Sequence, residues 1–136
     1  QGRPFTLVFL KIDNLSRINR DCSYLAGDKA LLMVAALIKK HASKIAHVGR
    51  FSDNSFMLLF PEKTKEEVEK SVSRIQKGVL KSGKKVSLYK GLFSVSTGVF
   101  SADQAVHIST EEVLNMAKRA VADDQLAREG VASQLE

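Results

Sequence analysis

The sequence is poor in cysteine and contains no long apolar run. Cys22 is the only cysteine, which excludes an internal disulfide and is typical of proteins in the reducing cytoplasm. No apolar stretch approaches the roughly 20 residues that span a bilayer, and the amino terminus lacks the basic and then apolar pattern of a signal peptide. We therefore expect a cytoplasmic segment that makes no contact with a membrane.

Residues that bind metals or act as nucleophiles are few and scattered. His41, His47 and His107 have no metal-ligand spacing, and the single cysteine has no sequence-near partner for a zinc site. Ser55 and Ser96 have no recognisable base and oxyanion arrangement around them. The residues alone therefore indicate neither a metal centre nor nucleophilic catalysis.

The chain is basic, but its positive charge is not concentrated. It has 21 Lys and Arg against 15 Asp and Glu, a net charge of +6, with small clusters at Lys39-Lys40-His41-Lys44 and Lys81-Lys84-Lys85. A basic surface can attract a polyanion, but groups of this size are more often a solvated helix face or loop. Since no Arg stripe and no aromatic RNA-binding motif accompanies them, we expect no nucleic-acid partner.

The first half of the chain predicts a buried strand and then two helices. Phe5 to Ile12 is almost continuously apolar, as expected for a central strand covered on both faces. Asp13 or Asn14 can accept hydrogen bonds from free backbone donors and so start a short helix. After a loop at Gly27-Asp28, helical spacing predicts a long amphipathic helix to about Ser43. Its apolar residues are Leu31, Leu32, Val34, Ala35, Leu37 and Ile38.

The second half predicts a hairpin, two further strands and two capped helices. Ile45 to Phe51 and Ser55 to Phe60 are β-prone and flank Asp53-Asn54, which tolerates a tight turn. Thr64 with Glu67 forms a capping box for a helix to about Leu80. The remaining predicted elements are strands at Val86 to Tyr89 and Leu92 to Phe100, and a terminal helix that starts at the capping box Ser109 with Glu112.

The order of these elements predicts an α+β domain. A hairpin inserted among strand and helix units predicts a mixed sheet of about five strands flanked by helices. With 136 residues and 44% hydrophobic content, one core is sufficient. The chain begins without Met and ends in a polar run, so we expect residues 1–136 to be a single domain of a larger protein.

Several separately placed motifs resemble those of one family. IDNLSRINRDCSYLAGDKALL is similar to Asp-x-Asp-x-Phe-Lys-x-x-Asn-Asp followed by Gly-Asp, and RFSDNSF occupies the place of a Gly-Gly-Asp/Glu-Glu-Phe turn. SVSTGVF is similar to the penultimate strand of the same family, and LNMAKRAVADDQLAREG is similar to its final helix. The chain thus resembles the bacterial GGDEF, or diguanylate cyclase, domains, which implies a nucleotide cyclase-like fold with a ferredoxin-like palm.

The resemblance also implies where catalytic groups would lie. Active members join two GTP molecules into cyclic di-GMP with two Mg²⁺ ions, which prefer carboxylate ligands. At the matching positions this chain has Lys11 and Asn54 in place of metal ligands and Ser55 in place of the catalytic Glu. An ammonium about 4 Å from a divalent ion would be repelled by roughly 8 kcal/mol at an effective dielectric near 20. Of the turn motif, which here is Ser52-Asp53-Asn54-Ser55-Phe56, only Phe56 is retained. We therefore predict a degenerate domain that binds no metal or other cofactor and is not an enzyme.

Both residues of the family's guanine-recognising pair are retained. Asn19 and Asp28 match the amide and carboxylate that hydrogen-bond the base, which leaves weak GTP binding open. The alternative is structural: Asn19 bridges the turn and Asp28 caps the long helix. The family's phosphate-binding Lys and Arg match Gln125 and Glu129, and its inhibitory Arg-x-x-Asp motif is absent at 43–46.

The resemblance implies a role in cyclic di-GMP signalling. We expect a regulatory domain that contacts a protein partner or an adjacent EAL (phosphodiesterase-type) domain, as in tandem GGDEF-EAL proteins of the FimX kind, which control type IV pili and twitching motility. The alternatives are a GTP-binding sensor for an adjacent EAL domain, and an active diguanylate cyclase. Dimerisation of the domain stays open.

Overall fold

The computed structural model describes residues 5–86, 93–102, 111–112, 115 and 118–126. Their order is β1 (Phe5–Asp13), α1 (Leu15–Asp21), α2 (Tyr24–Ala42), β2 (His47–Ser52), β3 (Ser55–Pro61), α3 (Lys65–Lys85) and β4 (Ser94–Ala102), followed by a helical segment at 118–126. The predicted strand at Val86 to Tyr89 and the predicted cap at Ser109 lie almost wholly outside the described residues.

The predicted α+β class is confirmed, with the four described strands in the order β2-β3-β1-β4. The interior strand β1 pairs with β3 from Phe5 opposite Pro61, and with β4 from Phe5 opposite Ala102. This arrangement matches the ferredoxin-like succession of strands and helices.

The sheet differs from the mixed one that the sequence predicts, because every described pairing is antiparallel. β1 and β2 do run in the same direction, as strands joined by helices commonly do, but the hairpin folds β3 back between them. The tight turn at Asp53-Asn54 pairs one edge of β3 with β2, so β1 pairs with the other edge of β3. The parallel pair is therefore separated by an intervening strand.

Two helix boundaries differ from the prediction, and local hydrogen bonds give the reason. α2 begins at Tyr24 because the Ser23 hydroxyl accepts a hydrogen bond from the Ala26 amide at 3.0 Å, so Gly27 and Asp28 are helical. α3 starts at the predicted Thr64 and Glu67 capping box but continues through Gly83 to Lys85. Asn14 precedes α1 in the left-handed region with φ 62°, which asparagine tolerates, and makes no side-chain cap.

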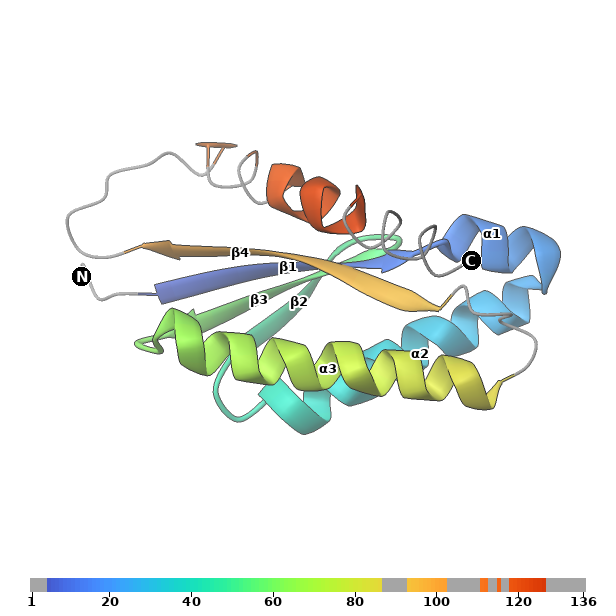
Figure 1. The fold of residues 1–136 in the computed structure, drawn as a ribbon, viewed down its shortest axis with the longest axis horizontal. Coiled ribbons are helices and arrows are strands. Elements are labelled where there is room, and N and C mark those ends of the chain that lie inside the picture. The colour runs from blue at the N-terminus through green and yellow to red at the C-terminus, as the bar shows by residue number, and fades with distance from the viewer. Residues whose placement is uncertain (1–4, 87–92, 103–110, 113–114, 116–117, 127–136) are drawn as a thin grey trace.

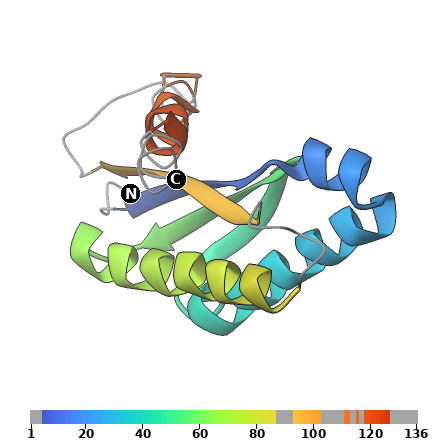
Figure 2. The same cartoon turned by 45° about the vertical axis from the view of Figure 1, so that its right-hand side comes forward.

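The sheet separates two apolar clusters of unequal size. Even-numbered residues of β1, such as Val8 and Leu10, face the long helices α2 and α3 and belong to the main core. Odd-numbered residues, such as Leu7 and Phe9, face the segment at 118–126 and form a small cluster with Val121. Figures 1 and 2 show α2 and α3 on one face of the sheet and this segment on the other.

Candidate functional site

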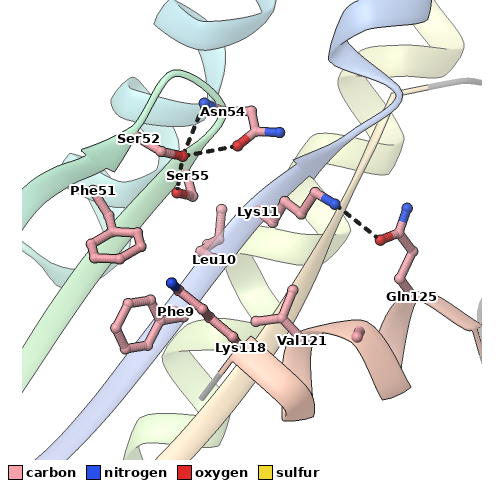
Figure 3. Close-up of a pocket in the computed structure, with 11 residues that line it drawn as sticks. Phe9, Leu10, Lys11, Phe51, Ser52, Asn54, Ser55, Lys118, Val121 and Gln125 are labelled. Atoms are coloured by element: carbon pink, nitrogen blue, oxygen red, sulfur yellow. Dashed lines mark hydrogen bonds between the residues drawn. The ribbon is translucent and has the colours of Figure 1, made fainter. Parts of the chain in front are cut away.

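A pocket of about 250 Å³ opens on the face with the smaller cluster. Its walls come from the hairpin turn, the end of β1 and the segment at 118–126, as Figure 3 shows. The lining residues are Phe9, Leu10, Lys11, Phe51, Ser52, Asn54, Ser55, Lys118, Val121, Ala122 and Gln125. The structure thus gathers Lys11 and most of the predicted turn residues with a helix that is distant in the chain.

Short hydrogen bonds within the turn hold its side chains. The Ser52 hydroxyl donates to the Asn54 side-chain oxygen at 2.9 Å and lies 2.5 Å from the Ser55 hydroxyl. The Asp53 carbonyl accepts from the Arg50 guanidinium at 3.0 Å, and the Asn54 carbonyl accepts from the Ile12 amide at 2.8 Å. The last bond fixes the turn against the end of β1, so the hairpin presents hydroxyl and amide groups to the pocket.

Phe56 and Asp53 have other roles than lining the pocket. Phe56 is buried in the main core, with the Arg50 guanidinium 5.3 Å from its ring centroid. Asp53 is exposed at the tip of the turn. The retained aromatic residue of the turn motif therefore anchors β3 rather than contacting the pocket.

Lys11 projects from the end of β1 and is half-buried. Its ammonium donates to the Gln125 side-chain oxygen at 3.3 Å. The sequence matches Gln125 with a phosphate-binding position of the family, and the structure places it beside the residue that matches a metal position. Glu129 lies outside the described residues.

The opposite wall of the pocket is aromatic. The Phe9 and Phe51 rings meet edge to face with centroids 5.1 Å apart, and the Lys118 ammonium lies 5.5 Å from the Phe51 centroid. Asp124, on the same helical segment, accepts a hydrogen bond from the Thr97 amide of β4 at 2.8 Å. The sequence alone gives no role to Phe9, Phe51 or Lys118, although the spacing of Lys118 and Val121 places both on one helix face.

The predicted guanine-recognising pair lies apart from this lining, where α1 meets α2. Asn19 is half-buried on α1, and Asp28 is exposed in the second turn of α2. Asn19 packs so closely on Gly27 that a Cβ there would overlap its amide. Because Ser23 caps α2, the alternative role of Asp28 as the helix cap is wrong.

Asp13 is buried, and its carboxylate accepts hydrogen bonds from the hydroxyls of Ser94 and Ser96 at 2.8 and 2.9 Å. Those bonds join the end of β1 to β4. The carboxylate thus has a structural role within the sheet, and Asp13 is the last residue of β1.

The pocket lining does not match the donor set that Mg²⁺ prefers. Proteins usually bind Mg²⁺ through one or two carboxylates, whereas the lining residues include no Asp or Glu. They offer two ammonium groups, which repel a cation, and only neutral oxygens, from two amides and two hydroxyls. In the described part of the chain, no group of three or more His, Cys, Asp or Glu residues is arranged to hold a metal.

No helix among the described residues is both long and apolar enough to cross a bilayer.

Comparison with known proteins identifies the family. The sequence model "Diguanylate cyclase, GGDEF domain" matches residues 1–129. Diguanylate cyclase DgcP of Pseudomonas aeruginosa is 28% identical over 132 residues, which are 90% of this chain but only 19% of that protein.

Solved structures agree on the fold. The GGDEF domain of DgcB from Caulobacter crescentus, in complex with c-di-GMP, has a TM-score of 0.79 and 21% identity, over 92% of this chain and 74% of that one. Diguanylate cyclase SiaD of Pseudomonas aeruginosa, in complex with its activator SiaC, has a TM-score of 0.78 and 19% identity, over 92% and 47%.

These comparisons correct one prediction. The matching model describes diguanylate cyclases, and the curated relative is itself a diguanylate cyclase, so the prediction that the chain is not an enzyme is wrong. Loss of activity does not follow from the substituted turn. Because the family model covers nearly the whole sequence, the chain belongs to the GGDEF family of diguanylate cyclase domains.

Proposed function

We propose that this GGDEF domain regulates cyclic di-GMP signalling through contact with a neighbouring domain or a protein partner. The observation that supports the proposal is the docking of the segment at 118–126 on the pocket. Lys118 of this segment lies over the Phe51 ring, and Val121 belongs to the small apolar cluster. Gln125 accepts a hydrogen bond from Lys11. A movement of this helix would therefore change the pocket, and a change in the pocket would act on the helix.

A solved relative offers a precedent for regulation by contact, since SiaD is held in complex with an activator protein. We extend the proposal to a single domain over residues 1–136 within a larger cytoplasmic protein, with an EAL domain as its neighbour and type IV pili as the controlled process. The full-length gene tests this extension. A neighbour other than EAL would contradict it.

Diguanylate cyclase activity is the second candidate function, and the 28% identity to DgcP favours it. GTP binding at Asn19 and Asp28 would serve either function. Incubation of the purified full-length protein with GTP and Mg²⁺, followed by chromatography for cyclic di-GMP, tests the second candidate directly. Product formation that is lost on Asp28→Ala would support it.

Two adjacent acids provide a matched test of regulation by contact. Asp124 accepts the Thr97 amide, whereas its exposed neighbour Asp123 lies on the same helix. We expect Asp124→Ala in the full-length protein to shift the cellular level of cyclic di-GMP severalfold, because a charge-assisted hydrogen bond that docks the helix is lost. Asp123→Ala removes the same charge and should leave the level unchanged. Equal levels in both variants and the wild type would contradict the proposal.

A further inference from the structure

The pocket contains two positive charges and several neutral hydrogen-bonding groups. Lys11 and Lys118 supply the ammonium groups from β1 and from the segment at 118–126. The remaining polar lining consists of the hydroxyls of Ser52 and Ser55 and the amides of Asn54 and Gln125. None of the described lining residues is acidic. This set of cations and donors is complementary to an oxyanion rather than to a metal ion.

Both ammonium groups are held by neutral partners. Lys11 donates to the amide oxygen of Gln125, and Lys118 lies against the Phe51 ring. Asp13 lies on the same face of β1 as Lys11, but two serine hydroxyls already donate to its carboxylate. An anion that entered the pocket could therefore take up the charge of both lysines while the neutral contacts exchange.

The apolar part of the lining strengthens such a contact. Phe9, Leu10 and Val121 exclude water from one side of the pocket, and a charged pair interacts more strongly where the local dielectric is lower. A divalent ion at the same place would meet the repulsion of Lys11. Two ammonium groups together carry the charge of one divalent ion, the kind of charge that bound metal ions supply in phosphate sites.

We propose that this pocket binds the phosphate group of a nucleotide through Lys11 and Lys118 without a divalent metal ion. The inference rests on the proposed function, because it names the chemistry of a ligand that would set the position of the segment at 118–126. A phosphate that draws Lys11 away from Gln125 and Lys118 away from Phe51 weakens two of the contacts that dock this segment.

Titration calorimetry on the full-length protein tests the inference with GTP, ATP and inorganic triphosphate, each in excess Mg²⁺ and in excess EDTA. We expect binding that persists in EDTA. Equal affinity for all three probes would identify the phosphate alone as the ligand, whereas tighter binding of GTP would add recognition of the base. Binding that requires Mg²⁺, or no binding of any probe, would overturn the proposal.

Lysine variants locate the site. Lys11→Met keeps the length of the side chain and removes its charge, so the dissociation constant in EDTA should rise about tenfold or more. Lys118→Met should raise it as well, and Lys11→Arg should restore most of the affinity. Lys81→Met removes an equal charge from the exposed face of α3 and serves as the matched control. An equal loss in Lys81→Met would show attraction to net charge only and would overturn the assignment.

The two proposals fail separately. If Asp124→Ala shifts the cyclic di-GMP level but no phosphate binds in EDTA, regulation by contact stands and the metal-free site is wrong. If phosphate binds through Lys11 but Asp124→Ala has no effect, the site stands and the regulatory role is wrong. Thermal unfolding of each variant, which should differ little from the wild type, establishes that a lost response is not a lost fold.

Discussion

The two faces of the sheet differ in what holds them together. On one face, α2 and α3 lie over a continuous apolar cluster that includes fully buried side chains such as Phe60, Ile75 and Ile38. On the other, the segment at 118–126 rests on a small cluster around Leu7, Phe9 and Val121, next to a pocket with polar walls. The first face stabilises the fold, and the second leaves room for a ligand.

This difference explains how the family fold persists while residues at the turn vary. The polar turn Ser52-Asp53-Asn54-Ser55 is fixed by its own hydrogen bonds and by one bond to Ile12, and only Phe56 enters the main core. Substitutions at the other turn positions therefore leave the large cluster intact. The helix at 118–126, in contrast, depends on contacts with pocket residues.

Alanine substitution of one phenylalanine on each face of the sheet tests the difference between the faces, and it has the largest expected effect. Phe60→Ala should lower the free energy of unfolding by about 3–5 kcal/mol, because a fully enclosed cavity forms between the sheet and the helices. Phe9→Ala, also at a buried position, should cost less, since the adjacent pocket lets its surroundings relax and admits water. Urea unfolding followed by circular dichroism measures both values.

If Phe9→Ala proved as costly as Phe60→Ala, the two faces would contribute equally and the distinction between them would be lost. Chemical-shift mapping by NMR adds a second readout. Perturbations in Phe9→Ala should be confined to the hairpin turn and the segment at 118–126.

Two glycine-to-alanine variants test the packing of α1 against α2 at Asn19. Gly27→Ala should destabilise the domain by about 1–3 kcal/mol despite the better helix propensity of Ala, because the new methyl overlaps the Asn19 amide. Gly78→Ala is the helical control: its methyl meets the flexible end of Leu37, which can move. Thermal unfolding compares them, and a double variant with Asn19→Ala should recover most of the loss. An additive double variant would show that Asn19 does not oppose the methyl.

Much of the first face could be predicted from sequence because its signals are local. The apolar run from Phe5 predicts a buried strand, and Thr64 with Glu67 correctly predicts the start of α3. The start of α2 was missed because Ser23 and Asp28 are both good capping residues, and only the structure selects Ser23. The antiparallel sheet could not be predicted from the order of the elements, because the position of β3 between β1 and β2 depends on tertiary packing.

The site was predictable only where it lies within one motif. Lys11 and the turn residues are predicted because the family has a metal-binding or catalytic group at the matching positions. Lys118 and Phe51 also lie within matched motifs, but at positions with no assigned role, and their contact joins residues far apart in the chain. The docking of Asp124 on the Thr97 amide is equally nonlocal, since a backbone donor carries no sequence signal.

The smallest predicted effect concerns the cap of α3 and depends on pH. Hydrogen bonds from the Thr64 backbone and hydroxyl lower the pKa of Glu67 below its ordinary value of 4.5. A carboxyl whose pKa is lowered by folding stabilises the protein above the ordinary pKa, and this contribution is lost as the pH falls through the folded-state value. Glu67→Gln should therefore be less stable than the wild type near neutral pH, and the difference should shrink below pH 4.5.

The exposed position of Glu67 keeps this difference small, and a neighbouring acid provides its control. Glu66→Gln removes the same charge from the first turn of α3 but leaves the capping box intact, so the Glu67 carboxylate still accepts from Thr64. Urea titrations at a series of pH values should separate the two variants, with the larger loss at neutral pH in Glu67→Gln. Identical pH profiles would mean that the interaction of both acids with the helix dipole accounts for the effect. The capping box would then contribute nothing measurable to the stability of the sheet face that α2 and α3 cover. Its stability would then rest on apolar packing, which sharpens its contrast with the polar pocket face.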